Sequence, residues 1–182
     1  MRIAEIYQSL QGEGLLTGTP SVFVRASGCN LRCGFCDTPF TSWEPEGDDL
    51  AVDEITDAVS RLSARHVVIT GGEPMLFAEM IPLTEYLHRQ GYHITIETAG
   101  TLFLPLQCDL MSLSPKLSNS APDRTRFPQW YERHERTRHA PDVVRKLIEL
   151  CDYQLKFVVA DRSDCEEVDQ YLVQFPEIRR DR

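Results

Sequence analysis

Runs typical of β-strands alternate with helical repeats along most of the chain. Six runs rich in β-branched and aromatic residues are expected as strands, at 2–10, 21–28, 66–72, 93–100, 108–114 and 153–159. Apolar residues recur at three- and four-residue spacing in segments expected as helices, at 52–62, 82–91, 144–151 and 168–175. This alternation predicts an α/β fold built on a parallel sheet.

Turn and capping residues mark the ends of three of these helices. Pro82 opens the second and Gly91 closes it, which is the usual distribution of these two residue types. Pro141 precedes the third. Ser163 and Glu166 have the spacing of a capping box, so the last helix is expected to be capped by Ser163.

Most of the expected strands run into polar or glycine-rich residues at their carboxyl ends. These ends are the loop that begins at Gly28 and the segments 70–74 (TGGEP), 97–100 (ETAG) and 112–116 (SLSPK). In a barrel of parallel strands, the carboxyl ends form the rim that holds the active site. The sequence therefore predicts a site at this rim.

Length and charge limit the classes of protein that this chain can be. Its 182 residues are expected to form one domain, 1–182. A net charge of −9 argues against a direct nucleic-acid ligand, because binding to phosphates is driven by basic residues. No stretch approaches the ~20 apolar residues of a membrane helix, so no membrane association is expected. We expect a reducing, cytoplasmic location.

The segment 117–141 interrupts the alternation and is rich in arginine, aromatic residues and proline. Segments of this composition between regular elements are usually insertions on the surface, and we expect a surface loop here. The alternative is a lid or a surface that docks a partner.

Three of the six cysteines, Cys29, Cys33 and Cys36, lie within eight residues. A [4Fe–4S] cluster can be held by one thiolate at each iron, and three thiolates on one loop would leave the fourth iron open. The alternatives are a zinc site completed by a distant residue and a simple electron-carrier cluster. The remaining three, Cys108, Cys151 and Cys165, are each expected to pack as a small apolar group.

The spacing of these cysteines, with Phe35 before the last of them, resembles the signature of the radical S-adenosylmethionine enzymes. The glycine-rich TGGEP at 70–74 resembles the element that meets the methionine amino group in that superfamily. The resemblance implies a partial β/α barrel, with S-adenosylmethionine bound at the open iron. It also implies cleavage of this cofactor by one electron to a radical that abstracts a substrate hydrogen.

Further motifs are similar to one subgroup, the 7-carboxy-7-deazaguanine synthases: YQSLQGEG, VFVRASGCNLRCGFCDT, ITGGEP, IETAGT and SLSPKLS. The resemblance as a whole runs from about 6 to 159. The resemblance implies a lyase that converts 6-carboxy-5,6,7,8-tetrahydropterin to 7-carboxy-7-deazaguanine with loss of ammonia, in queuosine and 7-deazapurine biosynthesis. It also implies a Mg²⁺ ion, an electron donor such as flavodoxin or ferredoxin, and a homodimer. An activase that makes a glycyl radical on a partner protein and a non-catalytic metal-binding module are the alternatives.

The resemblance assigns roles to individual positions. The substrate contacts are Leu10, Gln11, Gly12, Arg25 and Thr70, and Arg25 is expected to grip the substrate carboxylate with its planar fork. The S-adenosylmethionine contacts are Phe35, Asp37, Gly72, Ser114, Pro115 and Lys116. Thr38 is the expected Mg²⁺ ligand, and Glu97 is expected to contact cofactor or substrate.

One departure concerns the end of the chain. The family continues with a further strand that carries additional cofactor contacts, whereas this sequence ends on FPEIRRDR after a helical segment. We therefore expect an open barrel with an N-terminal strand extension and few helices, and with the final strand missing through a shortened C-terminus.

Overall fold

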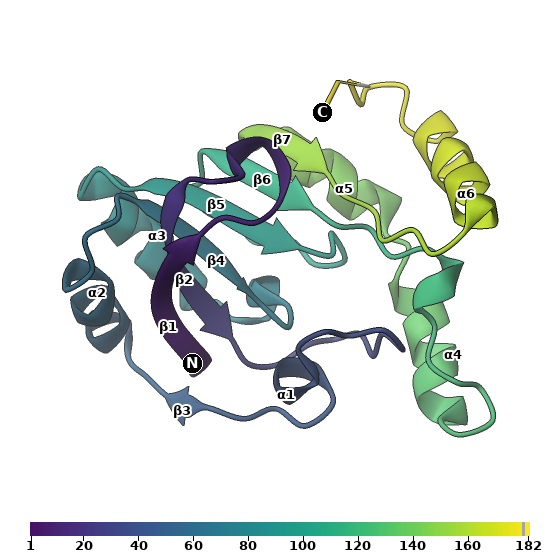
Figure 1. Cartoon of the computed structure of the whole chain (residues 1–182), viewed down its shortest axis with the longest axis horizontal. Coiled ribbons are helices and arrows are strands. Elements are labelled where there is room, and N and C mark those ends of the chain that lie inside the picture. The colour runs from purple at the N-terminus through teal and green to yellow at the C-terminus, as the bar shows by residue number, and fades with distance from the viewer. Residues whose placement is uncertain (180) are drawn as a thin grey trace.

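The computed structural model describes residues 1–179 and 181–182 and contains one open sheet of seven strands (Figure 1). The strand order is β3-β1-β2-β4-β5-β6-β7. The bounds are β1 Arg2–Leu10, β2 Pro20–Ala26, β3 Asp48–Asp49, β4 His66–Gly71, β5 His93–Thr98, β6 Leu110–Leu113 and β7 Asp152–Leu155. Neighbours from β2 to β7 pair in parallel, while β1 is antiparallel to both β2 and β3.

Six α-helices and three 3₁₀ turns accompany the strands in the described residues, and α6 follows the last strand. The α-helices are α1 Pro39–Ser42, α2 Val52–Ser60, α3 Met80–Arg89, α4 Pro128–Thr137, α5 Pro141–Ile148 and α6 Arg162–Val173. The 3₁₀ turns are η1 Gly14–Leu16, η2 Pro74–Leu76 and η3 Ser118–Ser120. Residues 99–109, all described, connect β5 to β6 without a helix, so the expected reduction in helices is present.

The core lies between the sheet and the helices α2, α3 and α5. All residues of β4 from His66 to Thr70 are buried, which is typical of a central strand in a parallel sheet. The apolar stripes expected on the helices are buried too: Ile55, Val59, Leu83, Leu87 and Leu147 have no exposed surface. Each such side chain stabilises the fold by ~2 kcal/mol.

Two helix starts differ from the sequence-based expectation. The cap of α6 is Asp161, whose carboxylate accepts hydrogen bonds from the amides of Ser163 and Asp164. The predicted cap at Ser163 was wrong because the helix begins at Arg162, so that Ser163 already lies in the first turn. The helix α3 begins at Met80, and Pro82 therefore lies within its first turn, where no intrahelical partner for its nitrogen is lost.

The prediction for the three scattered cysteines was wrong. Cys108 and Cys151 form a disulfide with a Cα–Cα distance of 6.3 Å. Each lies just before one of the paired strands β6 and β7, so the parallel pairing of these strands brings them together. Cys165 is exposed on α6.

The described residues contain no helix with the length and the apolar character that crossing a bilayer requires.

Candidate active site

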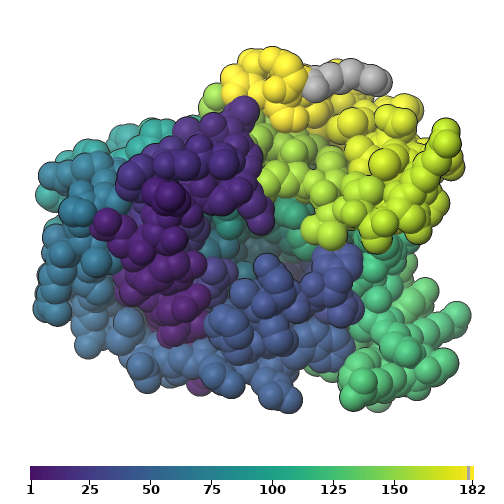
Figure 2. Space-filling model, in the orientation of Figure 1, coloured from purple at the N-terminus to yellow at the C-terminus, as the bar shows by residue number. Residues whose placement is uncertain are grey.

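The carboxyl ends of the parallel strands open into a cavity of about 620 Å³, a volume in the usual range for small-molecule sites. Figure 2 shows this hollow between the N-terminal segment in purple, the cysteine segment in blue and the C-terminal part in yellow-green. The predicted location of the site at this rim agrees with the cavity.

Nearly all of the sequence-predicted site residues line this cavity. They are Leu10, Gln11, Gly12, Arg25, Cys29, Cys33, Phe35, Cys36, Asp37, Thr38, Thr70, Gly72, Glu97, Ser114 and Lys116. Pro115 is not on the wall. Residues separated by more than one hundred positions in the sequence thus meet in one space, while their individual roles stay predictions.

The cysteine loop, residues 28–38, is held by hydrogen bonds from both sides. The Gly28 amide donates to the Thr41 carbonyl (2.8 Å), and the Trp43 indole donates to the Cys33 carbonyl (3.1 Å). Arg32 folds back, and its guanidinium donates to the Cys29 carbonyl (2.7 Å). The backbone of the loop is therefore ordered by contacts that leave the cysteine side chains on the cavity wall.

Gly72 packs directly under this loop. A Cβ atom at this position would lie 2.2 Å from the Gly28 oxygen and 2.7 Å from the Thr41 oxygen. The amide of Glu73 donates to the same Gly28 oxygen (2.8 Å). The glycine-rich TGGEP therefore forms the platform of the cysteine loop, because only a residue without a side chain permits this approach.

Burial dominates the electrostatics of the thiols. It raises the pKa of Cys29 to about 12 and that of Cys33 to about 11. Both groups need positive charge to become thiolates, and the irons of a cluster supply such charge. Polar donors already face the sulfurs: the Leu31 amide lies 3.4 Å from Cys29 Sγ, and the Ser42 hydroxyl lies 3.2 Å from Cys36 Sγ.

The three thiols of the cysteine loop share one cavity wall. Cys29, Cys33 and Cys36 are free and line one cavity. However, within residues 1–179 and 181–182 no three side chains of His, Cys, Asp or Glu converge closely enough to hold one metal ion. A zinc site needs four ligands around one centre, whereas each thiolate of a [4Fe–4S] cluster binds a different iron. The three free cysteines on this wall fit the three thiolate positions of such a cluster.

Glu73, within the TGGEP segment, has a buried supporting role that the sequence did not reveal. It is fully buried, and burial raises its pKa. Its carboxylate accepts hydrogen bonds from the Thr98 hydroxyl (2.7 Å) and from the amides of Met75 and Ala99. Glu73 thereby ties the turn after β4 to the end of β5, below the cavity.

A polar network covers the opposite wall. Glu97 accepts hydrogen bonds from the Gln11 amide (3.2 Å) and the Thr70 hydroxyl (2.8 Å). Lys156 lies 2.7 Å from the Glu13 carboxylate and 3.5 Å from that of Glu97. Lys156 was missed because it lies inside the strand expected at 153–159, whereas β7 ends at Leu155. A charged residue within an otherwise apolar run was the available signal.

Arg25 reaches the cavity already paired. Its Nε donates to Glu5 Oε1 (2.7 Å), and its NH2 group donates to the Tyr7 hydroxyl (3.0 Å). The side chain is 16% exposed. To bind a substrate carboxylate as predicted, the Arg25 guanidinium would have to donate hydrogen bonds to the substrate and to Glu5 at the same time.

The segment 117–141 packs against the cysteine loop through a buried histidine. His134 on α4 accepts a hydrogen bond from the Arg32 amide at Nδ1 (3.3 Å), and its Nε2 lies 2.8 Å from the Ser120 hydroxyl. The Ser120 carbonyl accepts from the Gly34 amide (2.9 Å). Burial lowers the pKa of His134 to about 4, so the ring is neutral and can use both nitrogens. The expected surface loop thus has a buried face.

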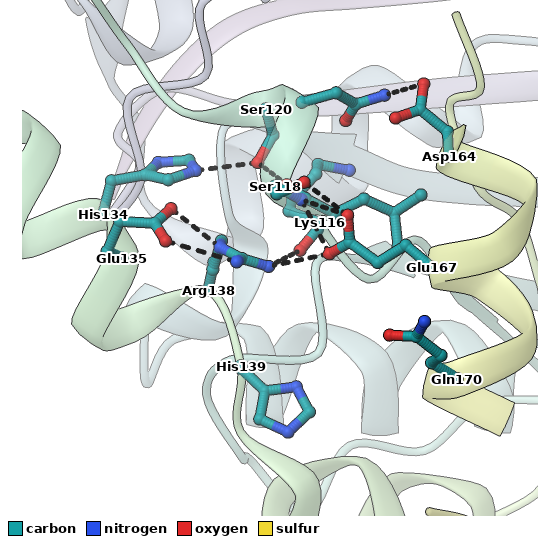
Figure 3. Close-up of polar contacts among 12 residues, drawn as sticks. Lys116, Ser118, Ser120, His134, Glu135, Arg138, His139, Asp164, Glu167 and Gln170 are labelled. Atoms are coloured by element: carbon teal, nitrogen blue, oxygen red, sulfur yellow. Dashed lines mark hydrogen bonds and ion pairs between the residues drawn. The ribbon is translucent and has the colours of Figure 1, made fainter. Parts of the chain in front are cut away.

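The same segment holds the SLSPK loop (Figure 3). Arg138 donates to the Lys116 carbonyl (3.1 Å) and forms ion pairs with Glu135 (2.8 Å) and with Glu167 of α6 (3.5 Å). The Lys116 ammonium turns back to the Ser114 carbonyl (2.8 Å). α4 therefore contacts two of the loops that form the rim of the cavity.

Comparison with known proteins first gives the class of the chain. Residues 23–156 match the Radical SAM superfamily, and the chain belongs to it. Enzymes of this superfamily work with a [4Fe–4S] cluster and S-adenosylmethionine and need an electron donor.

Individual relatives give the family within that class. The chain is 44% identical over 173 residues to the 7-carboxy-7-deazaguanine synthase of Rhodopirellula baltica and 47% identical over 177 residues to that of Halobacterium salinarum. Both comparisons cover 94% of this chain, and they cover 67% and 69% of the relatives. The crystal structure of QueE from Escherichia coli matches with a TM-score of 0.71 at 27% identity, over 98% of this chain and 80% of that one. The chain belongs to the 7-carboxy-7-deazaguanine synthase family, which confirms the resemblance and the partial barrel.

Proposed function

We propose that the chain is a radical S-adenosylmethionine lyase that converts 6-carboxy-5,6,7,8-tetrahydropterin to 7-carboxy-7-deazaguanine with loss of ammonia. This reaction belongs to the biosynthesis of queuosine and related 7-deazapurines. The observation that supports the proposal most directly is the shared cavity. Its wall carries the three free cysteines together with Gln11, Arg25, Thr70 and other expected substrate contacts.

The cysteine side of the cavity would hold the cofactors. Cys29, Cys33 and Cys36 would bind three irons, and S-adenosylmethionine at the fourth would lie near Phe35, Asp37, Gly72 and the loop Ser114, Pro115 and Lys116. The bound cluster and S-adenosylmethionine would supply a 5′-deoxyadenosyl radical for abstraction of a substrate hydrogen. Because hydrogen is taken as an atom, the main work of the chain is positioning and exclusion of water.

The polar wall would hold the substrate. A pterin edge offers both donors and acceptors, and the carboxylate of Glu97 and the amide of Gln11, 3.2 Å apart, present both kinds of partner. Thr70 and the stretch Leu10 to Gly12 complete this wall. Arg25 would bind the substrate carboxylate, and Arg25→Lys, which loses the planar fork, is expected to raise the substrate KM.

Thr38 is proposed as a Mg²⁺ ligand that helps to orient the substrate carboxylate. Its hydroxyl accepts a hydrogen bond from Thr41 Oγ1 (3.3 Å), and its side chain lies on the cavity wall. A hydroxyl oxygen suits this hard ion, which keeps several waters and uses few protein ligands. Turnover that is equal with and without Mg²⁺, after rigorous chelation, would remove this part of the proposal.

A soluble one-electron donor, such as flavodoxin or ferredoxin, would reduce the cluster, and the enzyme would act as a homodimer. Glycyl-radical activation of a partner protein remains the enzymatic alternative. The polar, small-molecule character of the cavity favours the pterin reaction over it.

The test is anaerobic reconstitution with iron and sulfide, followed by S-adenosylmethionine, dithionite and the carboxytetrahydropterin. Formation of 7-carboxy-7-deazaguanine, detected by mass spectrometry, is expected. 5′-Deoxyadenosine without deazaguanine would favour the activase, and the absence of both would leave only the metal-binding module.

A further inference from the structure

The segment 117–141 carries an unusual charge for this chain. It contains five arginines against three carboxylates, whereas the whole chain has a net charge of −9. Arg133 and Arg136 lie on α4, Arg124 and Arg126 precede it, and Arg138 caps its carboxyl end. Arg138 points inward to the Lys116 carbonyl and Glu135.

The other four arginines, Arg124, Arg126, Arg133 and Arg136, are exposed. No ion pair joins any of them to a carboxylate in the described part of the chain, 1–179 and 181–182. The carboxylate of Asp123 is engaged by the hydroxyl of Thr125 and by two backbone amides. Two exposed acids of the segment, Asp123 and Glu132, face four exposed arginines, so the exposed part of the segment is cationic in balance.

This cationic face lies against the cysteine loop. The guanidinium of Arg32, which lies between Cys29 and Cys33, stacks on the Trp130 ring at 4.1 Å from its centroid. Arg133 stacks on the same ring at 5.3 Å. Phe127 contacts Trp43, whose indole is bound to the Cys33 carbonyl (3.1 Å). One aromatic side chain therefore separates an exposed cation from the loop that carries the cysteines.

We propose that this face, formed by Arg133 and Arg136 on α4 and by Arg124 and Arg126 just before it, docks the protein that reduces the cluster, a one-electron carrier with an acidic surface. The inference rests on the proposed radical S-adenosylmethionine chemistry, which requires such an electron. In the docked complex the reduced carrier loses one electron and the cluster gains it, and no bond forms or breaks.

Electrostatics supports this occupant. Complexes for electron transfer are small and short-lived, and complementary charge raises their association rate more than their final affinity. The rest of the surface is acidic and would repel an acidic carrier. The patch thus provides both attraction and orientation at the place where the electron must enter.

The test compares charge removal on this face with equal charge removal elsewhere. Arg133→Gln with Arg136→Gln neutralises two exposed cations on α4. Arg61→Gln with Arg89→Gln is the matched control, because both residues are exposed at the far side of the molecule, after α2 and at the end of α3 (Figure 1). The probe is an acidic flavodoxin, reduced for stopped-flow measurement of cluster reduction and oxidised for calorimetric measurement of binding.

At low salt we expect the α4 variant to lose about tenfold in the second-order rate of cluster reduction, and the control variant about twofold or less. Calorimetric affinity should fall in the same order. The two variants and the original protein should converge at high ionic strength, where exposed charges are screened. Equal rates for the α4 variant and the control at low salt would overturn the proposal. So would loss of self-association in the α4 variant with unchanged flavodoxin kinetics, because the face would then bind a second copy of the chain.

Reduced methyl viologen separates this inference from the proposed function. As a small cation it gains nothing from the arginines, so 5′-deoxyadenosine formation driven by it should be the same in both variants and in the original protein. If viologen supports no 5′-deoxyadenosine in any of them, the proposed function fails. If viologen supports it in all of them while flavodoxin does not distinguish the variants, only the docking proposal fails.

Discussion

The cysteine loop and the segment 117–141 meet at the same edge of the cavity, but they are specified in different ways. The loop carries its chemistry in a short local pattern, Cys29, Cys33 and Cys36, and its glycine platform follows the next strand of the sheet. The segment has no such pattern. Its helix α4 is fixed by isolated long-range contacts, such as that between His134 and the Arg32 amide. A local motif can be read from one sequence, whereas a contact across one hundred residues requires the fold.

The comparison also separates the kinds of effect expected from mutation. Changes in the loop and its platform should abolish the cofactor site. Changes in the buried face of α4 should weaken cofactor binding by smaller amounts, since that face supports the cysteine loop through hydrogen bonds to its backbone.

The largest effect is expected for Cys33→Ala. Loss of one of three ligands should abolish the cluster, and with it 5′-deoxyadenosine formation, by more than a hundredfold. Cys165→Ala is the control, because Cys165 is free and exposed on α6. Iron and sulfide content together with 5′-deoxyadenosine yield measure both variants. Normal cluster content in Cys33→Ala would contradict the proposal that the cysteine loop binds the cluster.

A slightly smaller effect is expected for Gly72→Ala. Its new methyl group would meet the Gly28 and Thr41 oxygens, so the platform must move away from the loop. We expect a loss of ~3 kcal/mol in unfolding free energy and poor cluster retention, measured by urea unfolding and iron content. Gly18→Ala has a positive φ of 89° but open space around it, and should cost only ~1 kcal/mol. Gly72 does not have a positive φ, so equal losses in the two variants would show that its close approach to the loop costs little.

The third effect is a dependence of stability on pH. Burial lowers the pKa of His134 and of His66 from 6.5 to about 4. A depressed histidine pKa means that the fold favours the neutral ring. Stability is therefore complete above pH 6.5 and falls as the pH drops toward 4, by ~2 kcal/mol per histidine at pH 5.

Substitution of each histidine tests a different region, the sheet for His66 and the contact between α4 and the cysteine loop for His134. His66 lies in the sheet between Ser21 and Thr95, so His66→Gln should flatten the pH dependence of global unfolding. His134→Gln should act more locally, with faster hydrogen exchange at the Arg32 and Gly34 amides. Protection of those two amides that is unchanged in His134→Gln would contradict the assigned support of the cysteine loop by α4.

The smallest effect is expected for Arg138→Ala. It removes the donor to the Lys116 carbonyl and leaves Glu135 and Glu167 facing one another. One lost hydrogen bond of ~1 kcal/mol corresponds to a rise of about fivefold in the KM for S-adenosylmethionine, with little change in kcat. Arg138→Lys should recover part of it. Arg162→Ala, exposed at the start of α6, should leave both parameters unchanged.

Much of the fold could be predicted because it depends on local periodicity. The alternation of strands and helices predicted the parallel sheet, and polar residues at the strand ends predicted the rim where the cavity lies. The family was confirmed from motifs that combine glycines and cysteines at fixed spacing. Residue periodicity and motif spacing are local features of the sequence, so they can be interpreted without knowing which distant segments are in contact.

The remainder depends on which distant elements become neighbours. The disulfide of Cys108 and Cys151 follows from the pairing of β6 with β7, which the sequence did not show. Lys156 and Glu73 are single polar residues whose partners lie on other strands. Ser163 and Asp161, two positions earlier, are both good capping residues, and spacing alone did not distinguish them. The cap of α6 was therefore assigned to the wrong one.

The most direct test of the central claim is electron paramagnetic resonance of the reduced, reconstituted protein with and without S-adenosylmethionine. A [4Fe–4S] cluster on Cys29, Cys33 and Cys36 with one open iron should give a reduced-cluster signal whose g-values shift when the cofactor binds. A protein that takes up one zinc ion and no inorganic sulfide, or a cluster whose signal ignores S-adenosylmethionine, would contradict the account.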